Sequence, residues 1–227
     1  MSSYFRFLKS VGTDILSPAL QDFFRSAPDA LFIGSGLLAL ITQNYPLGIF
    51  MLTMIELTLV SYVLGKFIGS FESNFSKPSS DMCIPGIPSP YQISVVGNVL
   101  SQMTFPSGPV FFLSGSIFYI VLSSLNFRSE LTELGKKESE WKTRIPLGLV
   151  FSVLLLFSFC AFRLYNGCDG VLAILGSVVF GGVTGGLLYL LHVYLFGRDA
   201  INFLGLPLLG DKTADGRPLY VCAPQTS

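Results

Sequence analysis

The sequence predicts an all-α fold: a polytopic transmembrane helical bundle with four long spans, a shorter fifth span, and short interfacial N- and C-terminal segments. The composition is the first reason, because 51% of the 227 residues are hydrophobic and only 12% are charged, against about 25% charged residues in an average soluble protein. The second reason is the length of the apolar runs, since a helix needs about 20 apolar residues to cross the hydrocarbon of a bilayer. The third is that polar segments separate these runs into discrete helices.

Four apolar runs are long enough, or nearly so, to cross the membrane. They are Leu47–Ile68, Val110–Leu125, Ile145–Phe162 and Val171–Phe196. The shorter fifth run, Ala30–Thr42, is followed by a polar turn at 43–46. Because proline is common in the first turn of a helix, we expect Pro46 to open the second helix of a tight hairpin. A re-entrant or interfacial segment is the alternative for Ala30–Thr42.

The runs divide the chain into three parts. Residues 1–29 mix aromatic side chains with balanced charges, which is typical of a segment that lies along the membrane interface. Residues 30–196 form the transmembrane helical domain, and residues 197–227 form a short polar C-terminal tail. Within the tail, Asp215-Gly216 predicts a turn or small hairpin.

Five spans place the connecting segments on two sides of the membrane. Face A holds 1–29, 69–108 and 163–170. Face B holds the turn at 43–46, the segment 126–144 and the tail from 197. The segment 126–144, which we expect to form a short solvated helix, and the nearby Arg198 give face B the larger share of basic residues. The positive-inside rule therefore places face B in the cytosol.

Three short motifs lie on face A. The first is Lys77 followed after six residues by Ile84-Pro85, the second is Pro106-Ser107-Gly108-Pro109, and the third runs from Arg163 to Asp169. Their order, spacing and topology resemble the type 2 phosphatidic acid phosphatase superfamily of membrane lipid phosphatases. The signatures of that family are a Lys followed after six residues by Arg-Pro, then Pro-Ser-Gly-His, then Ser-Arg followed after five residues by a His and after three more by an Asp. The resemblance covers residues 47–190.

The residues that carry hydrolysis in that family are missing from this chain. Asp169 stands in the place of the nucleophilic His, Pro109 in the place of the acid His, and Ala173 in the place of the orienting Asp. Ile84 and Phe162 replace the Arg and the Ser of the first and third signatures. Both histidine roles need a group that titrates near neutral pH, and proline donates no proton.

The single histidine of the chain, His192, cannot take over either role. It follows Asp169 by 23 residues on the same predicted helix, which is about 35 Å along the axis at 1.5 Å per residue. It therefore belongs to the opposite side of the membrane. The resemblance implies a pseudoenzyme, with the architecture of the family and no catalytic residue.

The motif residues still allow a vestigial pocket for a phosphate or a lipid headgroup. Ser107 and Gly108 place free backbone N–H groups at a helix start, and Lys77 and Arg163 add positive charge and a bidentate donor. Asp169 would repel an anion there unless Arg163 pairs with it. The alternative is that the Pro-Ser-Gly-Pro stretch only caps a helix and that Arg163 and Asp169 form an interfacial ion pair.

Four glycines of the last span predict a helix-packing face. Gly181, Gly182, Gly185 and Gly186 form two overlapping small-xxx-small patterns, and such patterns let two helix backbones approach closely. We expect packing within the chain, with Gly34-Ser35-Gly36 as the facing segment. Dimerisation through the same face is the alternative.

The cysteines suggest one disulfide and no metal site. Cys83 and Cys168 both fall on face A, so an oxidising compartment on that side would allow a bridge between them. None of the four cysteines forms a CxxC pair, and the chain has one histidine. We therefore expect no metal and no cofactor.

Glu56 lies in the middle of a predicted span, where an ionised carboxylate is costly. One interpretation is a proton or ion site. The other is a protonated or hydrogen-bonded carboxyl that faces Thr53, Ser61 or a neighbouring helix. The sequence shows no basic partner at the same depth, which favours the second interpretation.

Together these features predict a multi-pass integral membrane protein that is non-catalytic and phosphatase-like. We expect it to have a structural or assembly role in a larger membrane complex, of which a virion membrane is one example. A divergent lipid-phosphate phosphatase or lipid-phosphate-binding protein is one alternative, and a small transporter or channel is another. The expected partners are membrane lipids and other protein subunits. Nucleic acid is not expected, because 14 Lys+Arg balance 14 Asp+Glu.

Overall fold

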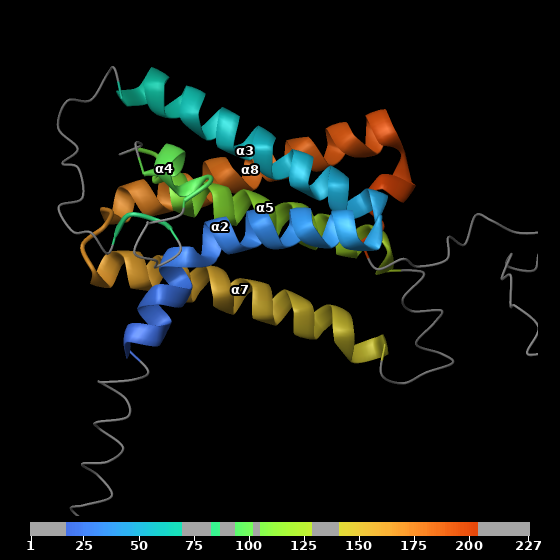
Figure 1. Cartoon of the computed structure of the whole chain (residues 1–227), viewed down its shortest axis with the longest axis horizontal. Coiled ribbons are helices and arrows are strands. Elements are labelled where there is room, and N and C mark those ends of the chain that lie inside the picture. The colour runs from blue at the N-terminus through green and yellow to red at the C-terminus, as the bar shows by residue number, and fades with distance from the viewer. Residues whose placement is uncertain (1–16, 70–82, 87–93, 102–104, 129–140, 204–227) are drawn as a thin grey trace, which may run out of the picture.

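A computed structural model shows the chain as a bundle of five long helices (Figure 1). It describes residues 17–69, 83–86, 94–101, 105–128 and 141–203. The long helices are α2 (Ser17–Thr42), α3 (Tyr45–Gly69), α5 (Gly108–Asn126), α7 (Trp141–Tyr165) and α8 (Val171–Phe196). Two short elements, α4 (Gly97–Leu100) and the 3-10 turn η3 (Arg198–Ile201), complete the described part, which contains no strand. The predicted all-α class is confirmed.

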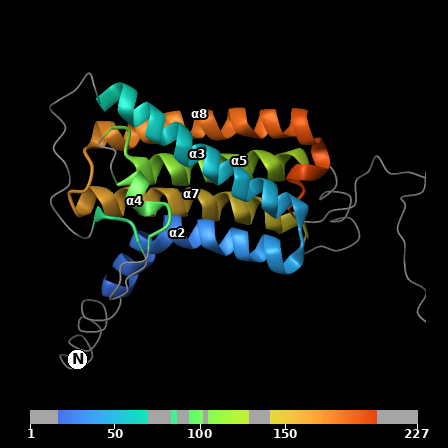
Figure 2. The same ribbon diagram turned by 45° about the horizontal axis from the view of Figure 1, so that its top comes forward.

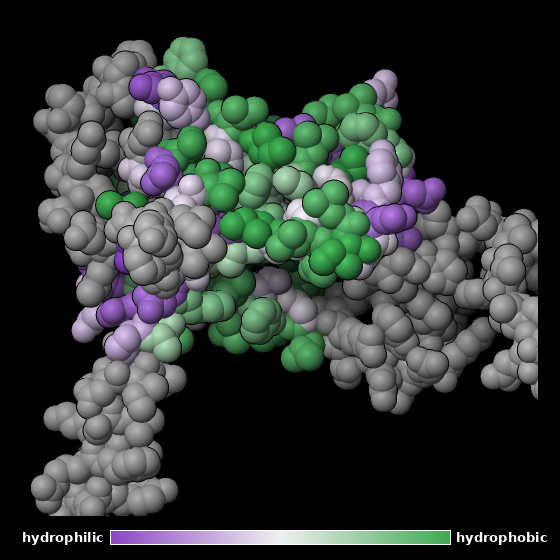
Figure 3. All heavy atoms as spheres, viewed as in Figure 1, coloured by the Kyte–Doolittle hydropathy of each residue, from purple (hydrophilic) through white to green (hydrophobic). Residues whose placement is uncertain are grey.

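Each of the five long helices is long and apolar enough to cross a membrane. Their outward side chains are apolar: Phe157 of α7 is 70% exposed and Leu172 of α8 is 72% exposed. Figure 3 shows such side chains across the middle of the visible face, with hydrophilic residues gathered toward its two ends. Apolar side chains of this kind face lipid, and the chain is a multi-pass integral membrane protein.

The helix bounds agree with the predicted spans except at the first one. The last helix begins and ends where the apolar run does, at Val171 and Phe196. The first is longer than expected, because Ala30–Thr42 is the second half of a helix that begins at Ser17. The boundary placed after residue 29 therefore falls inside α2. Charged residues such as Asp29 break the apolar run in the sequence, although Asp29 is buried and hydrogen-bonded in the structure.

The hairpin between α2 and α3 forms as the sequence predicts. Gln43 takes a left-handed backbone conformation with a φ of 50°, and the Asn44 side chain accepts a hydrogen bond of 3.3 Å from the Leu47 N–H. Pro46 occupies the first turn of α3, where its missing N–H costs nothing. A second proline, Pro28, lies inside α2, and that helix is visibly bent in Figures 1 and 2.

The glycine-rich face of α8 packs against α5. A Cβ atom on Gly185 would collide with the carbonyl of Gly115, and one on Gly181 would collide with the carbonyl of Phe111. The two backbones are therefore in direct contact. A Cβ on Gly182 would lie 3.1 Å from the ring of Phe118.

The prediction that Gly34-Ser35-Gly36 faces these glycines is wrong. Within Gly34-Ser35-Gly36, a Cβ on Gly34 would have no neighbour within 4 Å, and one on Gly36 would meet Met51 of α3. The pattern predicts a close contact because it reports small residues on one helix. It does not say which of four other helices fills the space.

The helix ends collect at the two ends of the bundle, as the two predicted faces require. Figures 1 and 2 show the end of α3, α4, the start of α5, the end of α7 and the start of α8 at one end, which is face A. The α2–α3 turn, the end of α5, the end of α8 and η3 lie at the other, which is face B. The tail hairpin expected at Asp215-Gly216 and most of the segment 126–144 lie outside the described residues.

No feature of the sequence predicts η3, which folds back onto face B. Its Arg198 donates hydrogen bonds of 3.0 and 2.6 Å to the side chain and the backbone carbonyl of Asn126. The guanidinium also lies 4.8 Å from the ring centre of Phe127. Arg198 therefore ties the segment after α8 to the end of α5.

Candidate functional site

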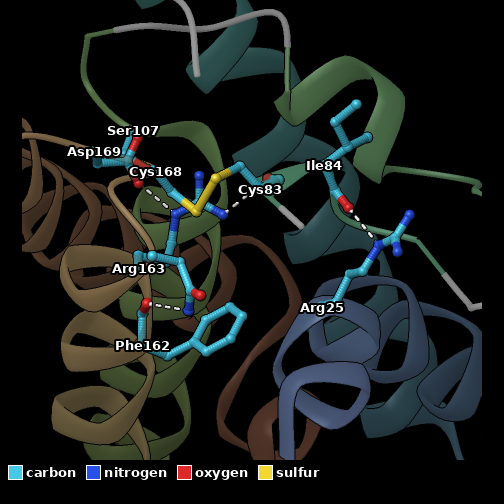
Figure 4. Close-up of a disulfide and its surroundings, with 9 residues drawn as sticks. Arg25, Cys83, Ile84, Ser107, Phe162, Arg163, Cys168 and Asp169 are labelled. Atoms are coloured by element: carbon cyan, nitrogen blue, oxygen red, sulfur yellow. Dashed lines mark hydrogen bonds and ion pairs between the residues drawn. A yellow bond between two sulfur atoms is a disulfide. The ribbon is translucent and has the colours of Figure 1, made fainter. Parts of the chain in front are cut away.

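A disulfide joins two segments that are far apart in the sequence. Cys83 lies before α4 and Cys168 lies in the turn between α7 and α8, and their Cα atoms are 5.2 Å apart (Figure 4). Both cysteines are buried. The bridge considered from the sequence is therefore present, and it joins the segment at Cys83 to the third motif.

Arg163 and Asp169 form a buried ion pair beside this bridge. Arg163 belongs to the last turn of α7 and Asp169 to the turn that follows. Their side chains are 5% and 6% exposed, and the guanidinium Nε contacts the Asp169 Oδ2 directly. The same carboxylate oxygen accepts a hydrogen bond of 2.7 Å from Ser107, and the Arg163 Nη1 donates one of 3.2 Å to the carbonyl of Cys83. Cys83 of the first motif thus meets residues of the second and third motifs in one cluster (Figure 4).

The turn between α7 and α8 brings Asp169 back over Arg163. Gly167 has a φ of 65°, a left-handed conformation that glycine adopts without strain. The N–H of Gly167 bonds to the carbonyl of Leu164 and the N–H of Cys168 bonds to that of Arg163. This arrangement ends α7 and reverses the chain within a few residues.

The second motif begins α5 and packs against α4. Ser107 is the N-cap residue, with an extended backbone, and Pro109 follows in the first turn. Gly108 touches the backbone of Leu100, where a Cβ would collide with the carbonyl. Gly108 is therefore held by packing, and its predicted neighbour in the pocket, Lys77, lies outside the described residues.

Two further polar residues at the face A end of the bundle make hydrogen bonds that no sequence motif predicts. Arg25 of α2 donates a hydrogen bond of 2.9 Å to the carbonyl of Ile84 (Figure 4). Asp29 is fully buried and accepts hydrogen bonds from the backbone N–H groups of Val95 and Val96, each 2.8 Å long. These partners are about sixty residues away in the sequence and belong to no recognisable motif, so no local signal could have found them.

A second polar cluster lies inside the bundle and overturns one expectation. Glu56 of α3 has a basic partner, because its Oε2 lies 3.1 Å from the Nε2 of His192 in α8. The hydroxyls of Tyr119 and Thr53 lie 3.0 and 3.2 Å from the Nδ1 of the same ring. The sequence gives the position of each residue along its own helix. It does not give the relative shift of the helices that brings Glu56 and His192 to one level.

Neither cluster gathers the ligands of a metal ion. Among the described residues, no group of three or more His, Cys, Asp or Glu side chains converges. The face A cluster offers one carboxylate, and its oxygen already accepts two donors from side chains of the chain.

Comparison with protein-family models, curated proteins and solved structures gives no match. The likeness to the lipid phosphatases rests on the motifs described above.

Proposed function

We propose that the chain is a non-catalytic, phosphatase-like membrane protein with a structural role in a larger membrane complex. The observation that carries the proposal is the engagement of Asp169, which occupies the position of the family's nucleophile. Its carboxylate is bound by Arg163 and Ser107 inside a cluster that the Cys83–Cys168 bridge also joins. We call these five residues the face A clasp.

The chemistry of the clasp argues against hydrolysis. A carboxylate that attacks phosphorus needs a free lone pair directed at the substrate. The Oδ2 of Asp169 instead faces an arginine and a hydroxyl, and the side chain is 6% exposed. Pro109 stands where the leaving group would receive its proton. A buried pair of this kind stabilises only when both charges keep their partners, which is the behaviour of a structural contact.

The same contacts argue against a headgroup pocket. A lipid phosphate could use Arg163 only by displacing Asp169, whose negative charge would then be buried without a partner. The backbone at the start of α5 is also closely packed, because Gly108 touches Leu100. The anion that the motif could hold is thus replaced by a carboxylate of the chain itself.

A turnover assay tests the non-catalytic role. The full chain is placed in nanodiscs that contain phosphatidic acid, and phosphate release is measured for the wild type, for Asp169→Ala and for Asp199→Ala. Asp199 is an exposed aspartate of η3 and serves as the matched control. We expect all three to release no more phosphate than empty nanodiscs. Turnover that is lost only in Asp169→Ala would overturn the proposal.

Copurification tests the assembly role. The chain is extracted from its native membrane in a mild detergent, and its mass is measured with its bound proteins. We expect a complex of defined stoichiometry. A lone monomer with no stable neighbour contradicts the assembly role, whatever the turnover assay gives.

A further inference from the structure

Three polar side chains from two helices converge around the single histidine of the chain, which lies on a third. Thr53 and Glu56 come from α3, Tyr119 from α5 and His192 from α8, and these helices lie side by side in Figures 1 and 2. The histidine is 1% exposed. The cluster lies within the candidate spans, near the end of α8 that is remote from the face A clasp.

The two hydroxyls at Nδ1 have different hydrogen-bonding capacities. Thr53 donates its own hydrogen to the carbonyl of Ile49, 3.0 Å away, so its oxygen can only accept from the imidazole. Such a bond requires a proton on Nδ1. The hydroxyl of Tyr119, 3.0 Å from the same nitrogen, can donate to Nδ1 when that nitrogen is bare. Nδ1 therefore has a suitable partner in either protonation state.

The other ring nitrogen faces a carboxylate in both states. The Nε2 of His192 and the Oε2 of Glu56 are 3.1 Å apart, within ion-pair distance, and neither atom makes a hydrogen bond among the described residues. With a carboxylate at Glu56 and a bare Nδ1, the pair would carry a net negative charge. A proton on Nδ1 produces an imidazolium and makes the pair neutral, which is the less costly state for groups inside a membrane.

The remaining titratable groups nearby are engaged elsewhere. Arg198 of η3 is bonded to Asn126, and Asp199 is exposed. Tyr189 accepts a hydrogen bond of 2.7 Å from the Asn126 side chain. In the described part of the chain, Glu56 is the acidic side chain that meets His192.

We propose that His192 is a reversible proton-binding site within the membrane, with Nδ1 as the atom that takes the proton. A hydronium ion gives up one O–H bond, an N–H bond forms at Nδ1, and water leaves. Glu56 supplies the counter-charge. The hydrogen bond from Tyr119 to Nδ1 is exchanged for one from Nδ1 to Thr53. The site does not depend on the role proposed for the face A clasp.

The unique histidine makes the test direct. The full chain is labelled with ¹⁵N-histidine and placed in nanodiscs, so every labelled ring signal comes from His192. Between pH 9 and pH 5 we expect a reversible conversion of Nδ1 from the bare to the protonated form. In Glu56→Gln the ratio of imidazolium to neutral imidazole at a given pH should fall about tenfold or more, because the negative charge beside the ring is lost.

Two further variants distinguish proton binding from a purely structural contact. Thr53→Val removes the acceptor of the protonated form and should lower the imidazolium ratio. Tyr119→Phe leaves a bare Nδ1 without a donor while a protonated Nδ1 keeps Thr53 as its acceptor, so this variant should raise the ratio. Thr58→Val is the matched control, because Thr58 lies on the same helix and makes the same kind of bond, to the carbonyl of Met54, and the ratio should not change.

The proposal fails if the His192 signals of the wild type are unchanged across this pH range. It also fails if Thr53→Val and Tyr119→Phe move the ratio in the same direction or not at all. Helical content and elution as a single species establish that each variant is folded. Should Glu56→Gln not fold, the wild-type titration and the two hydroxyl variants still decide the outcome.

Discussion

Replacing Arg163 by methionine removes the charge that neutralises Asp169 and keeps most of the side-chain volume. Both side chains of the pair are buried, at 5% and 6% exposure, so water cannot replace the lost partner. Breaking a buried ion pair on one side costs about 3–5 kcal/mol. The bond from Arg163 to the Cys83 carbonyl adds about 1 kcal/mol to that loss. We therefore expect Arg163→Met to lower the free energy of unfolding by about 4–6 kcal/mol.

A double-mutant cycle separates the pair from the packing around it. Reversible unfolding in mixed micelles is measured for Arg163→Met, for Asp169→Asn and for both together, with the disulfide intact in every sample. The double variant leaves no unpaired charge, so its loss should be smaller than the sum of the two single losses by at least about 2 kcal/mol. A loss below about 1 kcal/mol for Arg163→Met is the value of a solvated surface pair and would refute the clasp.

Three other changes probe the contacts that hold the bundle together. Cys83→Ser opens a disulfide that spans 85 residues and should lower the free energy of unfolding by about 4–5 kcal/mol in the same assay. If alkylation shows that the two thiols are free in the wild type, the substitution should have no such effect and the bridge is refuted. Gly185→Ala should destabilise the bundle by about 1–3 kcal/mol, because the added Cβ meets a backbone carbonyl of α5. In the control Gly186→Ala the added Cβ lies 3.6 Å from its nearest neighbour, so stability should change by less than about 0.5 kcal/mol. Equal losses in the two variants would contradict the packing of α8 against α5. Asp29→Ala leaves buried N–H groups without acceptors and should cost about 1–3 kcal/mol, and proteolysis of the loop before α4 should become faster.

Helix positions could be predicted from the sequence because burial in lipid imposes a length and a composition on each span. Val171–Phe196 was predicted to the residue because no charge interrupts it and glycine follows its end. The start of α2 could not be predicted in this way. Charged residues in its first half interrupt the apolar run, so a search for an apolar run of membrane-spanning length finds only its second half. A charge that is paired within the protein does not end a helix, and pairing cannot be inferred from one segment alone.

Side-chain partners were predictable only where a motif spacing linked them. The relation between Arg163 and Asp169 is local, six residues apart across a turn, and both the pair and its repulsive alternative could be considered in advance. The contact of Glu56 with His192 joins two helices through their relative shift along the bundle. That shift is set by the packing of glycines against α5 and of large side chains elsewhere. No local sequence pattern predicts this relative shift of the two helices.

The two polar clusters treat buried charge in opposite ways, and this difference separates their roles. In the face A clasp the hydrogen-bonding roles are fixed, because the guanidinium of Arg163 and the hydroxyl of Ser107 both donate to the Oδ2 of Asp169. Around His192, Thr53 can accept from a protonated Nδ1, and the Tyr119 hydroxyl can donate to a bare one. The clasp is therefore suited to a structural contact, and the cluster around His192 to a group that gains and loses a proton. A change of pH in the range where imidazole titrates should act on the cluster between α3, α5 and α8 and leave the clasp intact.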